Sequence, residues 1–249
     1  MLKVRIIPTI LISNSSVVKT IQYKNPRIVG DAISTIKVFS KRMADEMIIV
    51  DIEAYKNGIN FDLITNYTKF CNMPLTVGGG INTIDDAQKI FELGVEKIIL
   101  NSSFFYNKKI INQISKKFGS SSVVFSLDVR EDLKGYKIHS KSGNNLINDN
   151  IYSIIKNVIS EGAGEIVLNS ISRDGTYKGY DLELFKIVNE VVNVPIVLSS
   201  GCGTKKDCLD AFNVGAKAIA AGSIFFWIGE SIVSIKQYLK KHDINVRIT

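Results

Sequence analysis

The sequence is poor in histidine and cysteine, with 2 and 3 residues respectively among 249. His139 and His242 have no second metal ligand and no serine or cysteine nucleophile beside them, which argues against multi-histidine metal sites and histidine-based triads. Cys71, Cys202 and Cys208 match no zinc or redox spacing, so they indicate buried thiols in a reducing compartment. We therefore expect a cytoplasmic protein without a metal or a cofactor.

Long apolar runs and clusters of like charge are also missing. Apolar stretches such as 219–228 fall short of the roughly 20 residues that span a bilayer, and the N-terminus lacks a signal-peptide cleavage pattern. The net charge is +7, but the 31 lysines and arginines are spread along the chain. This pattern favours a solvated basic surface with phosphate-containing ligands over nucleic-acid or membrane binding.

Strand and helix patterns alternate along the whole chain. Short, β-branched apolar segments typical of strands buried on both faces occur at 4–10, 47–52, 75–77, 97–100, 123–127, 165–168, 195–198 and 218–221. Amphipathic segments with helical spacing lie between them, at 31–42, 84–93, 108–118, 151–161, 182–192 and 207–214. With no linker composition anywhere, residues 1–249 are expected to form one (β/α)8 barrel, a fold of about 250 residues.

The two halves of the chain resemble each other. Residues 77–81 (VGGGI) correspond to 199–203 (SSGCG), and 94–103 to 215–224, an offset of about half the chain. The offset is too long for a solenoid repeat of about 20–50 residues, so it indicates a duplicated half-barrel.

Glycine-rich turns follow strands in both halves. Glycine lets the backbone approach an anion, and the next helix offers free N–H groups at its N-terminus. A single such turn is often only turn chemistry, but two at equivalent positions predict two phosphate sites and a ligand with a phosphate at each end. The two phosphate sites are called the first and second cups below. The first cup is expected to consist of Gly80, Asn101 and Ser102, and the second of Gly175, Gly201, Gly222 and Ser223.

Three carboxylates are expected at the C-terminal ends of strands, where a barrel places its acids and bases. They are Asp51, Asp128 and Asp174. Asp128 is the candidate catalytic residue. For the other two a structural role stays open, since Asp51 can orient a loop and Asp174 can cap the turn before Gly175.

At the opposite end, charged residues stand at or near the starts of strands: Arg5, Glu46, Lys97 and Glu165. Two cations and two anions from different strands predict an ion-pair ring that closes the bottom of the barrel. A plug that serves stability alone explains these residues equally well.

Together these residues carry a family resemblance over nearly the whole chain. The matching segments are RIIP (5–8), VVK (17–19), GD (30–31), DE (45–46), DI (51–52), LTVGGGI (75–81), NS (101–102), FGS (118–120), Asp128, GAGE (162–165), RDGT (173–176) and GYD (179–181). The chain thereby resembles the cyclase subunit of imidazole glycerol phosphate synthase.

The resemblance implies a glutaminase partner on the bottom face, whose ammonia passes the gate of Arg5, Glu46, Lys97 and Glu165 and crosses the barrel. At the top it would attack a phosphoribulosyl-formimino aminoimidazole carboxamide ribonucleotide held by both phosphates. The resemblance also adds residues to the ligand site: Lys19, on a mobile first loop, Asn169 and Ser199.

One departure from the family concerns catalysis. The family uses aspartates at the ends of the first and fifth strands, but the first position here is Leu11. Leucine cannot transfer a proton, and losing a positioned acid or base costs about 10²–10⁴ in rate. Residues 13–16 (SNSS) also lack the family's usual loop, and Asn169 and Ser200 replace its threonine and glycine.

Leu11, with segments 18–20 (VKT) and 29–33 (VGDAI), resembles a paralogue found with surface-polysaccharide genes. That resemblance implies ammonia delivery to a separate, ATP-dependent sugar amidotransferase that forms an acetamidino group. The alternatives are an authentic cyclase of histidine biosynthesis and a phosphoribosyl isomerase of the same ancestry. Leu11 argues against the isomerase, which needs an acid or base at the first strand.

Overall fold

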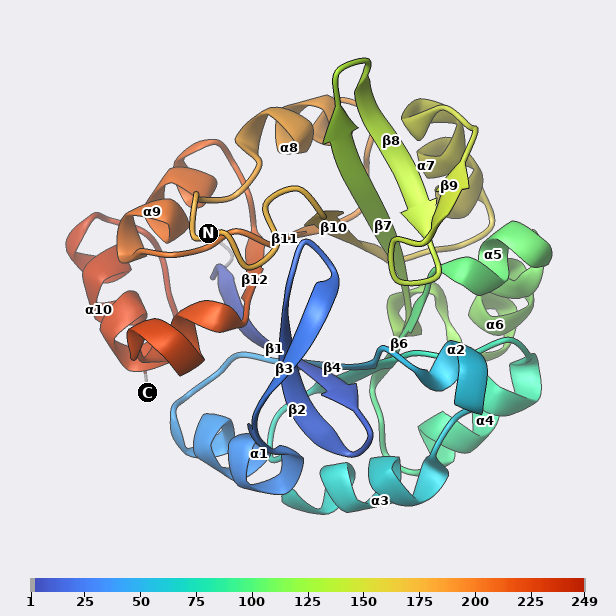
Figure 1. The fold of residues 1–249 in the computed structure, drawn as a ribbon, viewed down its shortest axis with the longest axis horizontal. Coiled ribbons are helices and arrows are strands. Elements are labelled where there is room, and N and C mark those ends of the chain that lie inside the picture. Colours follow the sequence, from blue (N-terminus) through green and yellow to red (C-terminus); the bar gives the residue numbers. More distant parts are fainter. Residues whose placement is uncertain (1–2, 249) are drawn as a thin grey trace.

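A closed barrel of parallel strands forms the centre of the computed structural model, which describes residues 3–248 (Figure 1). Its strands, in barrel order, are β1 (Arg5–Ser13), β4 (Met47–Asp51), β5 (Leu75–Gly78), β6 (Lys97–Leu100), β7 (Val123–Asp132), β10 (Glu165–Ser170), β11 (Ile196–Ser199) and β12 (Ala218–Ala221). The barrel closes because β7 pairs with β10 and β12 pairs with β1, both in parallel. The predicted (β/α)8 fold is confirmed.

Helices surround the barrel and cover its outer face (Figure 1). They are α1 (Ala32–Lys41), α2 (Ala54–Asn57), α3 (Phe61–Phe70), α4 (Ile84–Glu92), α5 (Ser102–Tyr106), α6 (Ile110–Phe118), α7 (Ile151–Ser160), α8 (Leu182–Asn189), α9 (Lys205–Asn213) and α10 (Ile232–Lys241), with short turns η1 (Ser120–Ser122) and η2 (Ile224–Ile228). Each long helix buries one apolar stripe; α7, for example, buries Ile154, Ile155 and Val158.

Two separate apolar clusters follow from the alternation of side chains along each strand. The larger one fills the space between the barrel and the helices. The smaller one lies inside the barrel and consists of Ile7, Ile48, Ile99, Val124, Val167, Val197, Ala218 and Ala220. Side chains therefore pack the interior as a layer.

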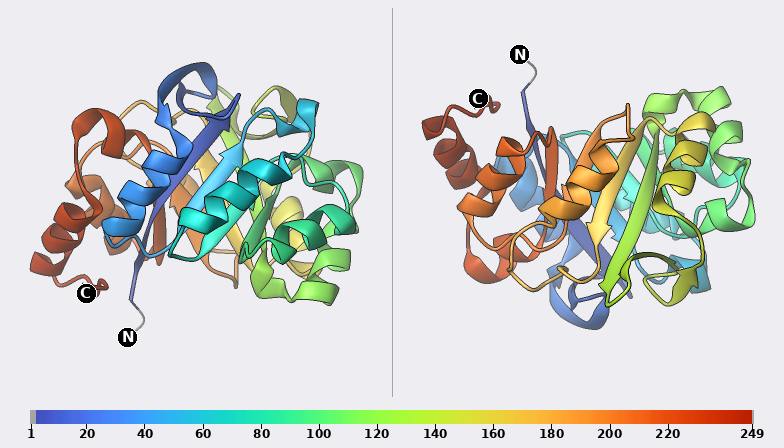
Figure 2. Two further views of the ribbon diagram at one scale, coloured as in Figure 1. Left: turned by 90° about the horizontal axis from the view of Figure 1, so that it is seen from below. Right: turned by 90° about the horizontal axis from the view of Figure 1, so that it is seen from above.

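Two antiparallel additions extend the barrel beyond the predicted pattern. Strands β2 (Ser16–Ile21) and β3 (Lys24–Asp31) form a hairpin after β1, and β8 (Gly135–Ser140) and β9 (Asn145–Ile147) continue from a lengthened β7. β3 is largely exposed, so strand pairing holds it in place and no apolar period marks it in the sequence. Both additions lie at the end of the barrel where the strands terminate, called the mouth below (Figures 1 and 2).

No helix in the described part of the chain combines the length and the apolar character needed to cross a membrane.

Candidate functional site

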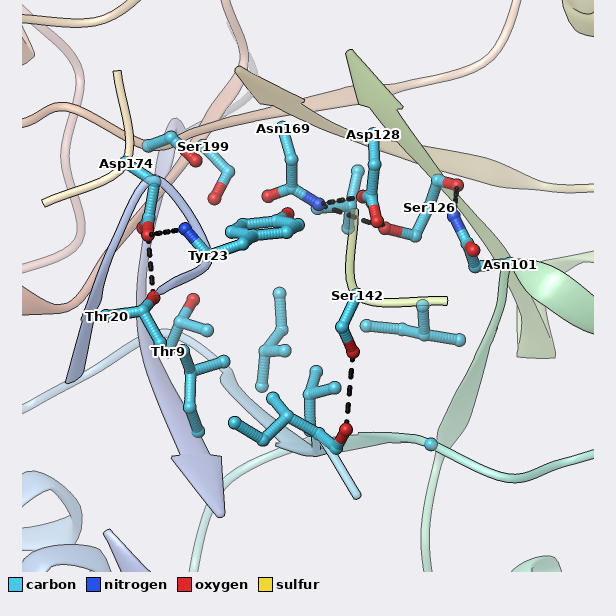
Figure 3. A pocket seen from close by; sticks show the side chains of 18 of the residues that line it. Thr9, Thr20, Tyr23, Asn101, Ser126, Asp128, Ser142, Asn169, Asp174 and Ser199 are labelled. Carbon is cyan, nitrogen blue, oxygen red and sulfur yellow. Dashed lines mark hydrogen bonds between the residues drawn. The ribbon is translucent and has the colours of Figure 1, made fainter. Parts of the chain in front are cut away.

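A pocket opens at the mouth, and the structure brings every predicted ligand-site residue to its wall (Figure 3). These residues are Lys19, Asp51, Gly80, Asn101, Ser102, Asp128, Asn169, Asp174, Gly175, Ser199, Gly201, Gly222 and Ser223. They come from the ends of different strands and from the loops that follow, as expected for this fold.

The two glycine-rich turns lead into helices that begin in the same way. Thr83 caps α4 and Thr204 caps α9, each in a capping box with an aspartate three residues later. Asp86 N donates to Thr83 Oγ1 at 3.0 Å, and Asp207 N donates to Thr204 Oγ1 at 3.2 Å. The two turns thus share their local geometry, as the predicted equivalence of the two halves requires.

Hydrogen bonds hold the first cup against the β8–β9 turn. Asn101 Nδ2 donates to Ser126 O at 2.8 Å, and Ser102 Oγ donates to Asn101 Oδ1 at 3.1 Å. Lys141 N donates to Ser102 Oγ at 2.9 Å, and both Lys141 and Ser142 line the pocket. No sequence pattern placed residues 141–142 here, because only the pairing of β8 with β7 returns this turn to the mouth.

Lys19 lies beside the second cup. Its Nζ donates to Thr9 O at 2.7 Å, and a Cβ added to Gly222 would lie 2.4 Å from that nitrogen, so a side chain at position 222 would force Lys19 to move. Burial lowers the pKa of Lys19 to about 8, an effect that the charge of Asp174 opposes. Lys19 lies in the connection between β1 and α1, as expected for the first loop, but this connection is the β2–β3 hairpin, and Lys19 itself is 6% exposed within β2.

Asp174 joins the β10–α8 loop to the β2–β3 hairpin. Its Oδ2 accepts from Thr20 Oγ1 at 2.7 Å and from Tyr23 N at 3.2 Å, while its carbonyl accepts from Gln22 N at 2.9 Å. Burial raises the pKa of Asp174, although these hydrogen bonds and Lys19 oppose the rise. The carboxylate therefore holds the hairpin, which differs from the local turn cap considered from the sequence.

Asp128 is buried within β7 and receives several hydrogen bonds. Ser126 Oγ donates to its Oδ1 at 2.8 Å, Asn169 Nδ2 donates to the same oxygen at 2.9 Å, and the Tyr23 side chain lies beside this group (Figure 3). Burial raises the pKa of Asp128, whereas these donors stabilise its charged form and lower the pKa.

Leu11 faces the pocket from β1, at the position where the family resemblance implies an aspartate. It pairs with Val50 of β4 and Val18 of β2, so its immediate strand neighbours are apolar. Asp51, one residue beyond Val50, uses Oδ1 to accept from Glu53 N at 2.9 Å and Ala54 N at 3.1 Å. These contacts match the loop-orienting role of Asp51, and burial raises its pKa.

The four charged residues at the opposite end form the predicted closed ring, called the ionic ring below. Arg5 pairs with Glu46 at 2.7 Å and with Glu165, and Lys97 pairs with Glu46 at 3.2 Å and Glu165 at 3.1 Å. Burial disfavours the charged guanidinium, but the hydrogen bonds and charges of both glutamates raise the pKa of Arg5. The apolar interior layer separates the ring from the pocket, whose wall includes Ile48, Ile99, Val167 and Ala220 of that layer.

Tyr23 is the main site residue that the sequence did not indicate. It occupies the two-residue turn of the β2–β3 hairpin with Gln22, and both have positive φ, 64° and 53°. Such turns usually carry glycine, asparagine or aspartate, so Gln-Tyr gives no turn signal. Within residues 3–248, no group of three or more His, Cys, Asp or Glu side chains gathers in a way that could hold a metal ion.

Comparisons with known proteins give a consistent match. Residues 5–229 match the family model described as "Histidine biosynthesis protein". The chain is 38% identical to the "Putative imidazole glycerol phosphate synthase subunit hisF2" of Campylobacter jejuni over 249 residues, all of both chains. It is 36% identical to the HisF subunit of imidazole glycerol phosphate synthase from Exiguobacterium sibiricum, covering 99% of this chain and 100% of that one. A second relative named hisF2, from Pseudomonas aeruginosa, is 38% identical over 92% and 93% of the two chains.

Proposed function

We propose that this chain, which belongs to the HisF family of histidine biosynthesis proteins, is the barrel subunit of a glutamine-dependent amidotransferase and conducts ammonia to a separate acceptor enzyme. The observation that carries the proposal is the coexistence of an intact ionic ring with a leucine at position 11. Loss of a proton-transfer group removes much of a cyclase's power but leaves conduction intact.

The interior of the barrel suits a small neutral molecule. Ammonia that passes the ionic ring meets the apolar layer around Ile48, Ile99 and Val167 before it reaches the pocket. An ammonium ion would lose its hydration there without a partner, whereas neutral ammonia loses far less. The apolar layer therefore favours the passage of neutral ammonia and disfavours the passage of the ammonium ion.

The partner that supplies ammonia is a glutaminase bound at the ionic-ring end. The acceptor is an ATP-dependent sugar amidotransferase of surface-polysaccharide biosynthesis, in line with the resemblance of Leu11 and its neighbouring segments to that paralogue. Two relatives carry the name hisF2, which supports a role for this chain separate from that of the ordinary synthase subunit. The pocket binds a phosphorylated ligand through the two cups.

A second function is favoured by one specific observation. Asp128 and both cups are in place, so an authentic cyclase of histidine biosynthesis would find its ligand site and one of its two carboxylates here. In that case Asp128 performs both proton transfers, or another residue near the mouth replaces the missing acid.

A reconstitution experiment tests the conduit. Glutamine hydrolysis by the partner glutaminase should rise when the barrel is added, and Lys97→Ala should alter ammonia delivery to the acceptor. Lys186→Ala, which breaks the exposed Lys186–Glu183 pair on α8, is the matched control and should leave delivery unchanged. A lack of association at micromolar concentrations would contradict the proposal.

A further inference from the structure

The turn of the β2–β3 hairpin holds an aromatic residue in an unfavourable backbone conformation. Tyr23 has a φ of 64°, in the left-handed region that bulky side chains rarely adopt. Backbone strain of this kind persists only where the surroundings fix it, and it is concentrated at functional sites. The strained turn is therefore a reason to ask what the Tyr23 side chain does.

Contacts with the β10–α8 loop fix the turn. Asp174 accepts hydrogen bonds from Thr20, Gln22 and Tyr23 N, and Gln22 Nε2 donates to Ser172 O at 3.1 Å. The approach is close, since a Cβ added to Gly175 would lie 2.3 Å from Thr20 O. These contacts attach the hairpin directly to the loop that carries part of the second cup. They are called the latch below.

The latched turn directs the Tyr23 ring into the pocket. In Figure 3 the ring lies between Asp174, next to the second cup, and the group of Asp128 and Asn101 at the first. The ring also lies near the β8–β9 turn, because a Cβ added to Gly143 would lie 3.3 Å from Tyr23 Cδ2. Ser126 and Asn169 both donate to Asp128 Oδ1, and the Tyr23 ring lies beside this group (Figure 3).

We propose that Tyr23 is the specificity-determining residue of the mouth, since its ring occupies the space between the two cups. With the hairpin latched, the pocket accepts small neutral molecules and single anions. A ligand that spans both cups and carries a phosphate at each end must first displace Tyr23. This inference deepens the proposed function, because it explains how a pocket with two cups can serve as an exit for ammonia.

Calorimetry with two probes tests the inference. Sulfate represents a single anion, and fructose 1,6-bisphosphate represents a ligand with two phosphates. Tyr23→Ala should bind the bisphosphate at least tenfold more tightly than the wild-type barrel, while its sulfate affinity stays within about twofold. Tyr23→Phe, which keeps the ring and removes only the hydroxyl, should show a smaller gain.

Tyr152→Ala is the matched control, because Tyr152 on α7 is exposed and lies outside the pocket wall; it should change neither affinity. Melting curves establish that each variant is folded. If Tyr23→Ala does not fold, the binding test is made with Tyr23→Phe alone. An unchanged or weaker bisphosphate affinity in the folded Tyr23 variants would overturn the inference, as would an equal gain for sulfate. The glutaminase assay does not depend on these affinities, so failure of either proposal is recognised separately.

Discussion

The ammonium group of Lys97 on β6 lies 3.1 Å from the carboxylate of Glu165 on β10, across the end of the barrel opposite the mouth. Lys97 also pairs with Glu46, and both glutamate side chains are only about a tenth exposed, at 8% and 12%. A cation between two mostly buried anions stabilises the ring, and its removal leaves the anions to repel each other.

Lys97→Ala is therefore expected to lower the free energy of unfolding by about 1–3 kcal/mol, between the values for exposed and fully buried pairs. Urea denaturation measures the change. Lys186→Ala should cost no more than about 0.5 kcal/mol, since its ion pair is exposed. Equal effects of the two substitutions would mean that the ring contributes no special stability.

Anion binding at the second cup should depend on the protonation of Lys19. Because its pKa is lowered to about 8, Lys19 is cationic below that pH and neutral above it. Sulfate keeps a constant charge, so its affinity should fall by up to about tenfold between pH 7 and pH 9 as one nearby positive charge is lost. Calorimetry at several pH values measures the fall. Lys19→Met should bind sulfate weakly at all of them; a slope that persists in this variant would assign the effect to another group.

Tyr23→Phe should raise the pKa of Asp128 further. The Tyr23 hydroxyl stabilises the charged carboxylate and lowers its pKa, whereas phenylalanine keeps the burial that raises it. Carbon-13 NMR of the labelled carboxyl group measures the titration. A pKa that is unchanged or lower in Tyr23→Phe would show that the hydroxyl does not hold Asp128.

Gly175→Ala should detach the hairpin from the β10–α8 loop. Gly175 has a φ of 67°, and its added Cβ would lie 2.3 Å from Thr20 O, so strain and steric conflict act together. We expect a loss of about 1–3 kcal/mol in stability and faster proteolysis within residues 16–31. Gly94→Ala has the same kind of backbone strain, at φ 89°, without any atom within 4 Å. Cleavage of the hairpin at equal rates in both variants would argue against the latch.

The sequence predicts the barrel well because its strands are buried on both faces and the intervening helices are amphipathic. The capped helices after Gly80 and Gly203 also follow from local residues, Thr83 with Asp86 and Thr204 with Asp207. The hairpin could not be predicted in this way. β3 is mostly exposed, and the turn at Tyr23 adopts its conformation through contacts with Asp174, 151 residues away.

The candidate site, like the fold, is predicted from the sequence only in part. Strand ends place Asp128 and Asn169 side by side because β7 and β10 pair in register there. The neighbours that modify Asp128, by contrast, depend on tertiary contacts: Tyr23 arrives from the hairpin, and the residues that enclose its ring arrive from the β8–β9 turn.

Steady-state cyclisation by the isolated barrel tests the central claim most directly. The wild-type protein is given free ammonia and the family substrate, phosphoribulosyl-formimino aminoimidazole carboxamide ribonucleotide, and turnover is compared with that of Leu11→Asp. Because one of two proton-transfer groups is missing, we expect the wild type to be at least about a hundredfold slower than a true cyclase. Leu11→Asp should recover part of that rate, incompletely because residues 13–16 also differ and support the new carboxylate poorly. Wild-type turnover of about 1 s⁻¹ or faster would contradict the conduit and identify the chain as a working cyclase.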